Sequence, residues 1–170
     1  MRASAARLCA VAGGVVLLDQ LTKFIVMATL PFHTSRPVIG NVVRLTYIKN
    51  QGIAFGLLSD SGLPFAFVSI AAMLLILFSL RRLPKEAAAP RFAMAAILGG
   101  AAGNLIDRVR FGEVVDFIDI GIAHLRWPVF NFADVAVTTG VCLFVVGSVL
   151  KRDEQPPTVE SEAGPSLGSA

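Results

Sequence analysis

The chain has 170 residues, of which 55% are hydrophobic and 16% are charged, and its mean hydropathy is +0.70. A soluble domain of this length carries roughly a quarter charged residues. The composition therefore excludes an ordinary soluble domain and favours a membrane-embedded one. The formal net charge of +3 is explained by membrane topology and does not require a nucleic-acid-binding surface.

Four apolar stretches predict four transmembrane helices, because a helix needs about 20 mainly apolar residues to cross the bilayer core. The third and fourth stretches reach a spanning length only if Asp107 and Asp134 are included, so these two carboxylates are expected near helix ends. The helices are expected at about residues 8–30, 63–80, 91–108 and 129–150.

The basic residues predict the orientation of these helices. Both termini are expected in the cytoplasm and the two longer loops outside, because those loops carry fewer basic residues over a longer stretch. The polar residues Asp19, Gln20 and Lys23 in the first apolar segment favour a retained helix over a cleaved signal peptide. The cytoplasmic side would hold Arg2, Arg7, Arg81, Arg82, Lys85, Arg91, Lys151 and Arg152.

The outer loop after the first helix has the pattern of a small β-sheet. Val43, Leu45 and Tyr47 alternate with polar residues, and Gly40-Asn41 before them suits a hairpin turn. We expect this sheet over about residues 37–60. The chain is then one membrane-embedded domain over residues 1–152, followed by a disordered cytoplasmic tail at 153–170.

The third helix carries polar side chains after a glycine-rich segment. Gly99 and Gly103 lie four residues apart, a spacing that lets neighbouring helices approach closely. One turn later, Asn104, Asp107 and Arg108 have spacings of three and four residues, so the three are expected to share a helix face.

Asp116 and Asp134 are the candidate reactive pair. Asp116 lies in the second outer loop, and Asp134 lies three residues after Asn131 at the outer end of the fourth helix, so both are expected at one depth. Two carboxylates in one site cannot easily both ionise, so such a pair holds a single proton and can act on one water as base and acid. Asp119 is interpreted as a solvated loop residue.

The other acids, and Asp134 itself, have structural interpretations. Asp134 can cap its helix, and Asp107 can form an ion pair with Arg108 that holds the third helix in place. Asp19 and Lys23 can neutralise each other at their four-residue spacing or contact a substrate. No cysteine or histidine cluster has metal-ligand spacing, so neither a metal nor a cofactor is expected.

Five segments between residue 8 and about residue 150 occur in a distinctive order and spacing: Asp19–Lys23, Asn50–Gly56, Gly99–Arg108, Val115–Phe117 and Phe130–Asp134. Together they resemble the five signature blocks of bacterial lipoprotein signal peptidase (signal peptidase II). Only the polar tail lies outside this resemblance.

The resemblance implies an all-α integral membrane fold of four transmembrane helices, with a small periplasmic β-cradle and a short periplasmic helix over the site. It implies an aspartyl endopeptidase of the bacterial inner membrane that acts at the periplasmic face. The implied partners are membrane lipids and prolipoproteins, which are cleaved just before a diacylglyceryl-modified cysteine. Globomycin-type cyclic peptides are the implied inhibitors.

The resemblance also implies roles for individual residues. Asp116 and Asp134 match the catalytic dyad. The positions that match supporting or substrate-binding residues are Asn104, Asp107, Arg108, Asn131, Asn50, Gly52, Asp19 and Lys23.

Two other functional classes fit an acidic membrane protein less well. A proton-coupled transporter or channel subunit would string carboxylates along the membrane depth, whereas Asp107, Asp116 and Asp134 are expected at one face. A purely structural adaptor leaves the repeated Asn-x-x-Asp spacing unexplained.

Overall fold

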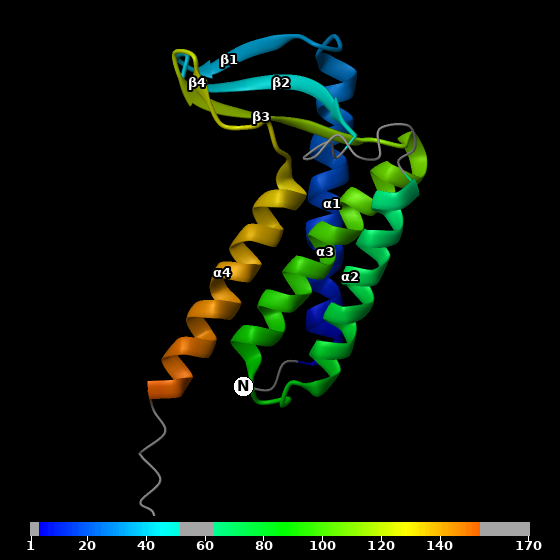
Figure 1. Ribbon diagram of the computed structural model, residues 1–170, viewed down its shortest axis with the longest axis vertical. Helices are drawn as coiled ribbons and strands as arrows, with labels where there is room; N and C mark the ends of the chain where they lie inside the picture. Colours follow the sequence, from blue (N-terminus) through cyan, green and yellow to red (C-terminus); the bar gives the residue numbers. More distant parts are fainter. Residues whose placement is uncertain (1–3, 52–62, 154–170) are drawn as a thin grey trace, which may run out of the picture.

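The structure is a computed structural model that describes residues 4–51 and 63–153. Four helices form the body of the molecule, and a sheet lies across one end of them (Figure 1). The helices are α1 (Ala5–Thr29), α2 (Leu63–Arg82), α3 (Ala88–Phe111) and α4 (Phe132–Asp153). The strands are β1 (Ser35–Ile39), β2 (Val43–Asn50), β3 (Val114–Ile122) and β4 (Leu125–Arg126).

Each predicted helix has a counterpart, and no end differs by more than three residues from the prediction. The fourth helix begins at Phe132, later than predicted, because Asn131 accepts a hydrogen bond from the first turn and so precedes the helix as its cap. The predicted tail lies outside the described residues from 154 onward.

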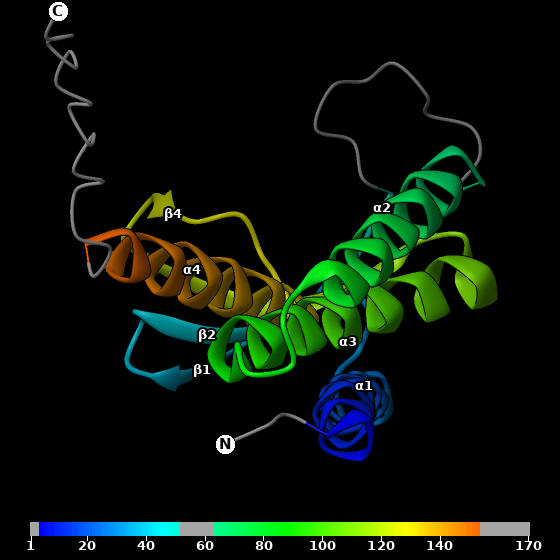
Figure 2. The same cartoon turned by 90° about the horizontal axis from the view of Figure 1, so that it is seen from below.

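Helix α3 is the centre of the bundle and packs against the other three helices (Figure 2). Its glycines allow this. A Cβ at Gly99 would lie 2.6 Å from the carbonyl oxygen of Ala12 in α1, and one at Gly100 would lie 2.5 Å from that of Ala133 in α4. Gly103 has a different role from the predicted one, because the space beside it holds the Asp19 carboxylate.

The sheet is an antiparallel meander with strand order β1-β2-β3-β4. The predicted hairpin turn is present: Gly40 has a φ of +49°, and the Val42 N–H donates to the Ile39 carbonyl. The predicted range of 37–60 covers only part of this sheet, because β3 and β4 come from the second outer loop.

A cluster of apolar side chains attaches the sheet to the end of α1. Val26 and Leu30 from α1 pack against Tyr47 of β2 and against Val115 and Phe117 of β3. Gly112 ends α3 in a left-handed conformation with a φ of +75°, and β3 starts two residues later. The chain thus turns directly from the central helix into the strand that carries Asp116.

Asp119 differs from its predicted solvated state. It is 5% exposed and forms an ion pair with Arg126, and it also accepts a hydrogen bond from Thr46. These partners come from β2 and from the end of β4, so the residues next to Asp119 in the sequence do not indicate them. The short outer helix implied by the resemblance has no counterpart in residues 4–51 and 63–153.

The outer surface of the bundle is apolar. Within the described residues, α1 and α3 are each long and apolar enough to cross a membrane. Large side chains such as Leu17, Phe24, Phe67 and Leu143 are all more than half exposed. Exposed apolar surface on this scale marks a contact with lipid or with a partner, and it agrees with the hydrophobic composition.

The close contact at Gly100 is expected to matter for stability. Gly100→Ala places a methyl group against the α4 backbone, which must then move away, and this should cost about 1–3 kcal/mol. The measurement is thermal unfolding of the protein purified in detergent. Gly14→Ala is the matched control, because a Cβ there meets nothing within 4 Å. Equal losses of stability in the two variants would contradict this role of Gly100.

Candidate active site

Asp116 lies on β3 opposite Ile48 of β2 and is 2% exposed. Asn50 is two residues further along β2, so its side chain points to the same face of the sheet. Its Nδ2 donates to Asp116 Oδ2 at 2.9 Å. The other carboxylate oxygen, Oδ1, accepts a hydrogen bond of 2.7 Å from Asn131 Nδ2.

Asp134 lies in the first turn of α4 and forms a reciprocal cap with Asn131. The Asp134 N–H donates to Asn131 Oδ1 at 3.0 Å, and the Asn131 N–H donates to Asp134 Oδ2 at 3.2 Å. This is the pattern of a capping box, here built from Asn and Asp. The predicted capping function of Asp134 is therefore real but shared, since Asn131 is the cap residue.

Asn131 joins the two candidate carboxylates. It is fully buried, and its amide contacts Asp116 while its backbone and Oδ1 contact Asp134. Backbone hydrogen bonds between Phe130 and Ile118 hold the segment before α4 against β3. The sheet and the end of α4 thus bring Asp116 and Asp134 to either side of one amide.

Asn104 of α3 connects this pair to a second polar cluster. Its Nδ2 donates to Asp134 Oδ1 at 2.8 Å. Its Oδ1 accepts hydrogen bonds from Asn131 Nδ2 at 3.0 Å and from Lys23 Nζ at 2.9 Å.

The second cluster is a buried group of charges between α1 and α3. Lys23 is 1% exposed, and its Nζ lies 2.9 Å from Asp19 Oδ2 and 2.7 Å from Asp107 Oδ2. The pairing of Asp19 with Lys23 agrees with their spacing. Asp19 also accepts from the Ala133 N–H, and Asp107 accepts from the Val115 N–H. Both acids therefore bind the starts of neighbouring elements.

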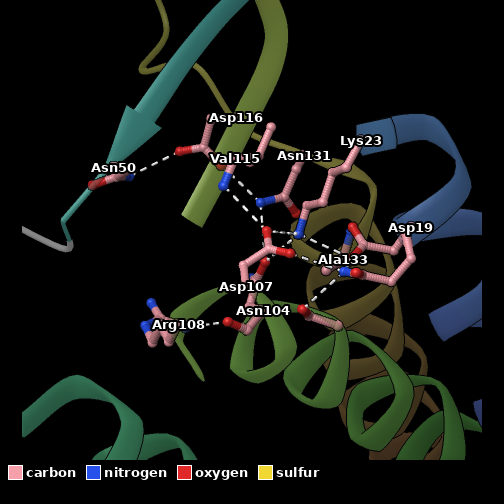
Figure 3. A network of polar contacts seen from close by, with 12 residues as sticks. Asp19, Lys23, Asn50, Asn104, Asp107, Arg108, Val115, Asp116, Asn131 and Ala133 are labelled. Atoms are coloured by element: carbon pink, nitrogen blue, oxygen red, sulfur yellow. Dashed lines mark hydrogen bonds and ion pairs between the residues drawn. The ribbon is translucent and has the colours of Figure 1, made fainter. Parts of the chain in front are cut away.

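The predicted ion pair between Asp107 and Arg108 is wrong. Figure 3 shows Arg108 on the side of Asp107 away from Lys23. Its guanidinium lies 3.5 Å from Ser69 Oγ of α2 and 3.4 Å from the Asn104 carbonyl. Successive residues on a helix point about 100° apart, so adjacency in the sequence did not imply contact. Arg108 interacts electrostatically with Asp134, Asp116 and Asp107, so Asp107 is a neighbouring charge but its close ion pair is with Lys23.

Burial is the main influence on the pKa of the Asp116 carboxyl. It raises the pKa of this carboxyl from 3.8 to about 6, against hydrogen bonds from Asn50 and Asn131 and with a further upward contribution from the negative charge of Asp134. A carboxyl with this pKa takes up a proton close to neutral pH. The arrangement therefore suits a pair in which one member is protonated and the other ionised.

Two depressions adjoin the site. A groove of about 300 Å³ is lined by Trp127, Phe130, Asp134, Val135, Thr138 and Thr139. A broader depression of about 890 Å³ lies over the sheet and includes Asn50 and Tyr47 in its lining. Asp134 is therefore reachable from a mainly apolar groove beside α4, and Asn50 from the face of the sheet.

The comparisons with known proteins identify the family of this chain. The family model described as signal peptidase (SPase) II matches residues 11–150. The chain belongs to the signal peptidase II family. Lipoprotein signal peptidases of Syntrophus aciditrophicus and Desulforapulum autotrophicum are 44% and 45% identical to it, over 85% and 86% of this chain and 92% and 93% of theirs.

Solved structures support the fold of this signal peptidase II family member. Two structures described as bacterial membrane enzymes, at 2.3 and 1.9 Å resolution, superpose with TM-scores of 0.79 and 0.80 at 33% identity. They cover 90% and 88% of this chain, which in turn covers 93% and 96% of theirs. The protein is thus a membrane protein of a peptidase family.

One polar side chain at the site was missing from the predicted set. Gln20 Nε2 donates to Asp19, to Asp107 and to the Gly103 carbonyl. Its position beside an aspartate inside an apolar helix could have indicated that Gln20 belongs to the site. Of the predicted positions, Gly52 lies outside the described residues, and the other nine lie in or beside the two connected clusters.

The raised pKa of Asp116 predicts a pH-dependent stability. Between about pH 4 and pH 6 the folded protein binds this proton more tightly than the unfolded chain does, so the contribution of Asp116 to stability falls as the pH rises through that range. Asp116→Asn lacks this loss, so its stability relative to the unsubstituted protein should rise by up to about 3 kcal/mol between pH 4 and a pH above 6. Thermal unfolding in detergent at pH 4.5 and 7.5 measures the gap, and a pH-independent gap would contradict the prediction.

The site also predicts resistance to chelators. In the part of the chain that the structure describes, no group of three His, Cys, Asp or Glu side chains is placed to hold a metal ion. Peptidase activity should therefore survive EDTA with less than about a twofold loss, because two carboxylates can supply the acid and base without a metal. Loss of activity that added zinc restores would contradict a metal-free site.

Proposed function

We propose that the protein is an aspartic endopeptidase of the bacterial inner membrane that removes signal peptides from diacylglyceryl-modified prolipoproteins. Cleavage would fall just before the lipidated cysteine. The observation that carries this proposal is the joining of Asp116 and Asp134 by Asn131. The curated relatives, named lipoprotein signal peptidases, support the class of substrate.

The two carboxylates would have different roles in the reaction because their surroundings differ. Asp134 lines the groove beside α4, where water and a substrate can reach it, and its two oxygens accept N–H groups from Asn104 and Asn131. Asp116 is buried and has a raised pKa, which favours its protonated form. Asp134 is therefore the proposed base, and Asp116 the proposed acid.

In the proposed reaction, Asp134 takes a proton from a water molecule whose oxygen attacks the scissile carbonyl carbon. Asp116 donates its proton to the carbonyl oxygen as the tetrahedral intermediate forms. When the C–N bond breaks, Asp134 passes its proton to the leaving amine of the cysteine. The new carboxyl terminus of the signal peptide returns a proton to Asp116, so the enzyme ends as it began.

The surroundings of the pair suit a lipid-linked peptide. The groove beside Asp134 is lined by Trp127, which precedes α4, and by Val135 and other side chains of α4. This helix has an apolar outer face. A substrate can leave its acyl chains in the lipid while its scissile bond reaches the carboxylates. Globomycin-type cyclic peptides would inhibit by occupying this site.

The direct test is cleavage of a diacylglyceryl-prolipoprotein by the purified protein, with the released signal peptide identified by mass. Asp116→Asn and Asp134→Asn should each lower turnover by roughly 10³-fold or more, because an amide cannot exchange a proton with water. The double variant should be hardly worse than either single variant, because the two groups act as one unit.

Glu86→Gln is the matched control for these variants. It makes the same carboxyl-to-amide change on an exposed residue between α2 and α3, at the end of the bundle away from the sheet, and it should cleave normally. Substantial cleavage by both single dyad variants, with normal substrate binding, would rule out the proposed mechanism.

The proposed membrane orientation predicts the outcome of reporter fusions. Fusions after Arg82 and at the C-terminus should report the cytoplasm, and fusions near Asp60 and Ile122 should report the periplasm. This follows from the excess of basic residues at the end of the bundle away from the sheet. A periplasmic C-terminus would contradict the four-helix topology.

A further inference from the structure

The Asn104 side chain lies between the buried charges and the candidate pair, and its direction is decided by its neighbours. Lys23 Nζ lies 2.9 Å from one end of the amide, and Asp134 Oδ1 lies 2.8 Å from the other. An ammonium group has three donors and no acceptor. The end of the amide that faces Lys23 must therefore be the oxygen, and the end that faces Asp134 must be the N–H.

The reverse orientation would be unfavourable at every contact. An amide nitrogen would then face the Lys23 ammonium and the Nδ2 of Asn131, which is itself a donor. The amide oxygen would face the Asp134 carboxylate, where a good contact needs a proton on that acid. Asn131 cannot turn to compensate, because its own oxygen accepts the Asp134 backbone N–H.

We propose that Lys23 is a positioning residue for the reaction: its ammonium fixes the Asn104 amide so that an N–H points at Asp134 and holds that carboxylate ready as the base. This inference rests on the proposed function, and it assigns Lys23 a part in catalysis at a distance. Lys23 does not contact Asp134 itself, because Asn104 lies between them.

Charged groups of both signs surround Asp134. Besides Asp116 of β3, the charged groups that face the site are Asp19 and Lys23 from α1 and Asp107 and Arg108 from α3. Two are acidic and two are basic, so their formal charges cancel. Asn104 donates directly to Asp134, whereas Lys23 contacts the other end of that amide.

The first test uses two variants that differ only in having an N–H donor at position 23. Asp19→Asn combined with Lys23→Met, and Asp19→Asn combined with Lys23→Gln, both keep the net charge of the Asp19, Lys23 and Asp107 group at minus one. Methionine and glutamine are similar in size, but only glutamine can donate to Asn104. Asp19→Asn by itself measures the effect of losing that charge.

The pH profile of kcat is the readout, because a merely structural role would not displace it. The methionine variant should have an acid limb about one pH unit above that of the glutamine variant, which carries the same charge, with kcat about tenfold lower on that limb and KM within about twofold. Folded methionine and glutamine variants with the same profile would overturn the inference.

Asn104→Asp provides a second test that leaves Lys23 in place. It keeps an oxygen for the Lys23 ammonium, replaces the N–H that faces Asp134 by an oxygen, and adds a negative charge beside that carboxylate. It should fold and show the same upward displacement of the acid limb. A wild-type profile would overturn the inference even if the variants at position 23 do not fold.

The outcomes separate this inference from the proposed function. Turnover by Asp116→Asn and Asp134→Asn would defeat the proposed function itself. Inactive dyad variants, together with a wild-type profile for Asn104→Asp and the same profile for the methionine and glutamine variants, would defeat only the positioning role of Lys23.

Discussion

The fold depends on the burial of one ammonium group between two carboxylates. Removing these charges from water is costly, and the cost is offset only if every hydrogen-bonding position is used. Lys23 meets this condition with Asp19, Asp107 and Asn104. The same acids bind the first N–H groups of other elements, at Ala133 in α4 and Val115 in β3. One cluster of charges thus sets the relative positions of α1, α3, α4 and β3.

The candidate pair is connected to this cluster through Asn104. Asp134 stabilises the first turn of α4 through the capping box with Asn131, and Asp116 is held by amides from two different elements. Neutral amides hold a carboxylate without adding a charge that would suppress its reactivity. The polar groups at the site therefore serve stability and proposed chemistry together.

Local patterns in the sequence predicted the parts of the site that lie on one element. The spacing of Asp19 and Lys23 predicted their contact, and the three-residue spacing of Asn131 and Asp134 indicated a shared function. The strand alternation in the first outer loop predicted β2 and its turn. Each of these features is decided within a few residues along the chain.

Contacts between distant elements were not predictable in this way. Asp107 was expected to bind its neighbour Arg108, but its partner Lys23 lies on another helix. Asp119 was expected in water because nothing near it in sequence shows that β2 and the end of β4 enclose it. Hydrophobic periodicity gives the face of an element that is buried, but it does not say which element covers that face.

The capping box at the start of α4 has a consequence for biogenesis. Asp134 lies on α4, and its carboxylate gains its hydrogen bond from Asn104 only when the first turn of that helix docks against α3. A nascent chain with three inserted helices therefore has an incomplete site. If Asp116 and Asp134 act as proposed, peptidase activity begins only after α4 has docked.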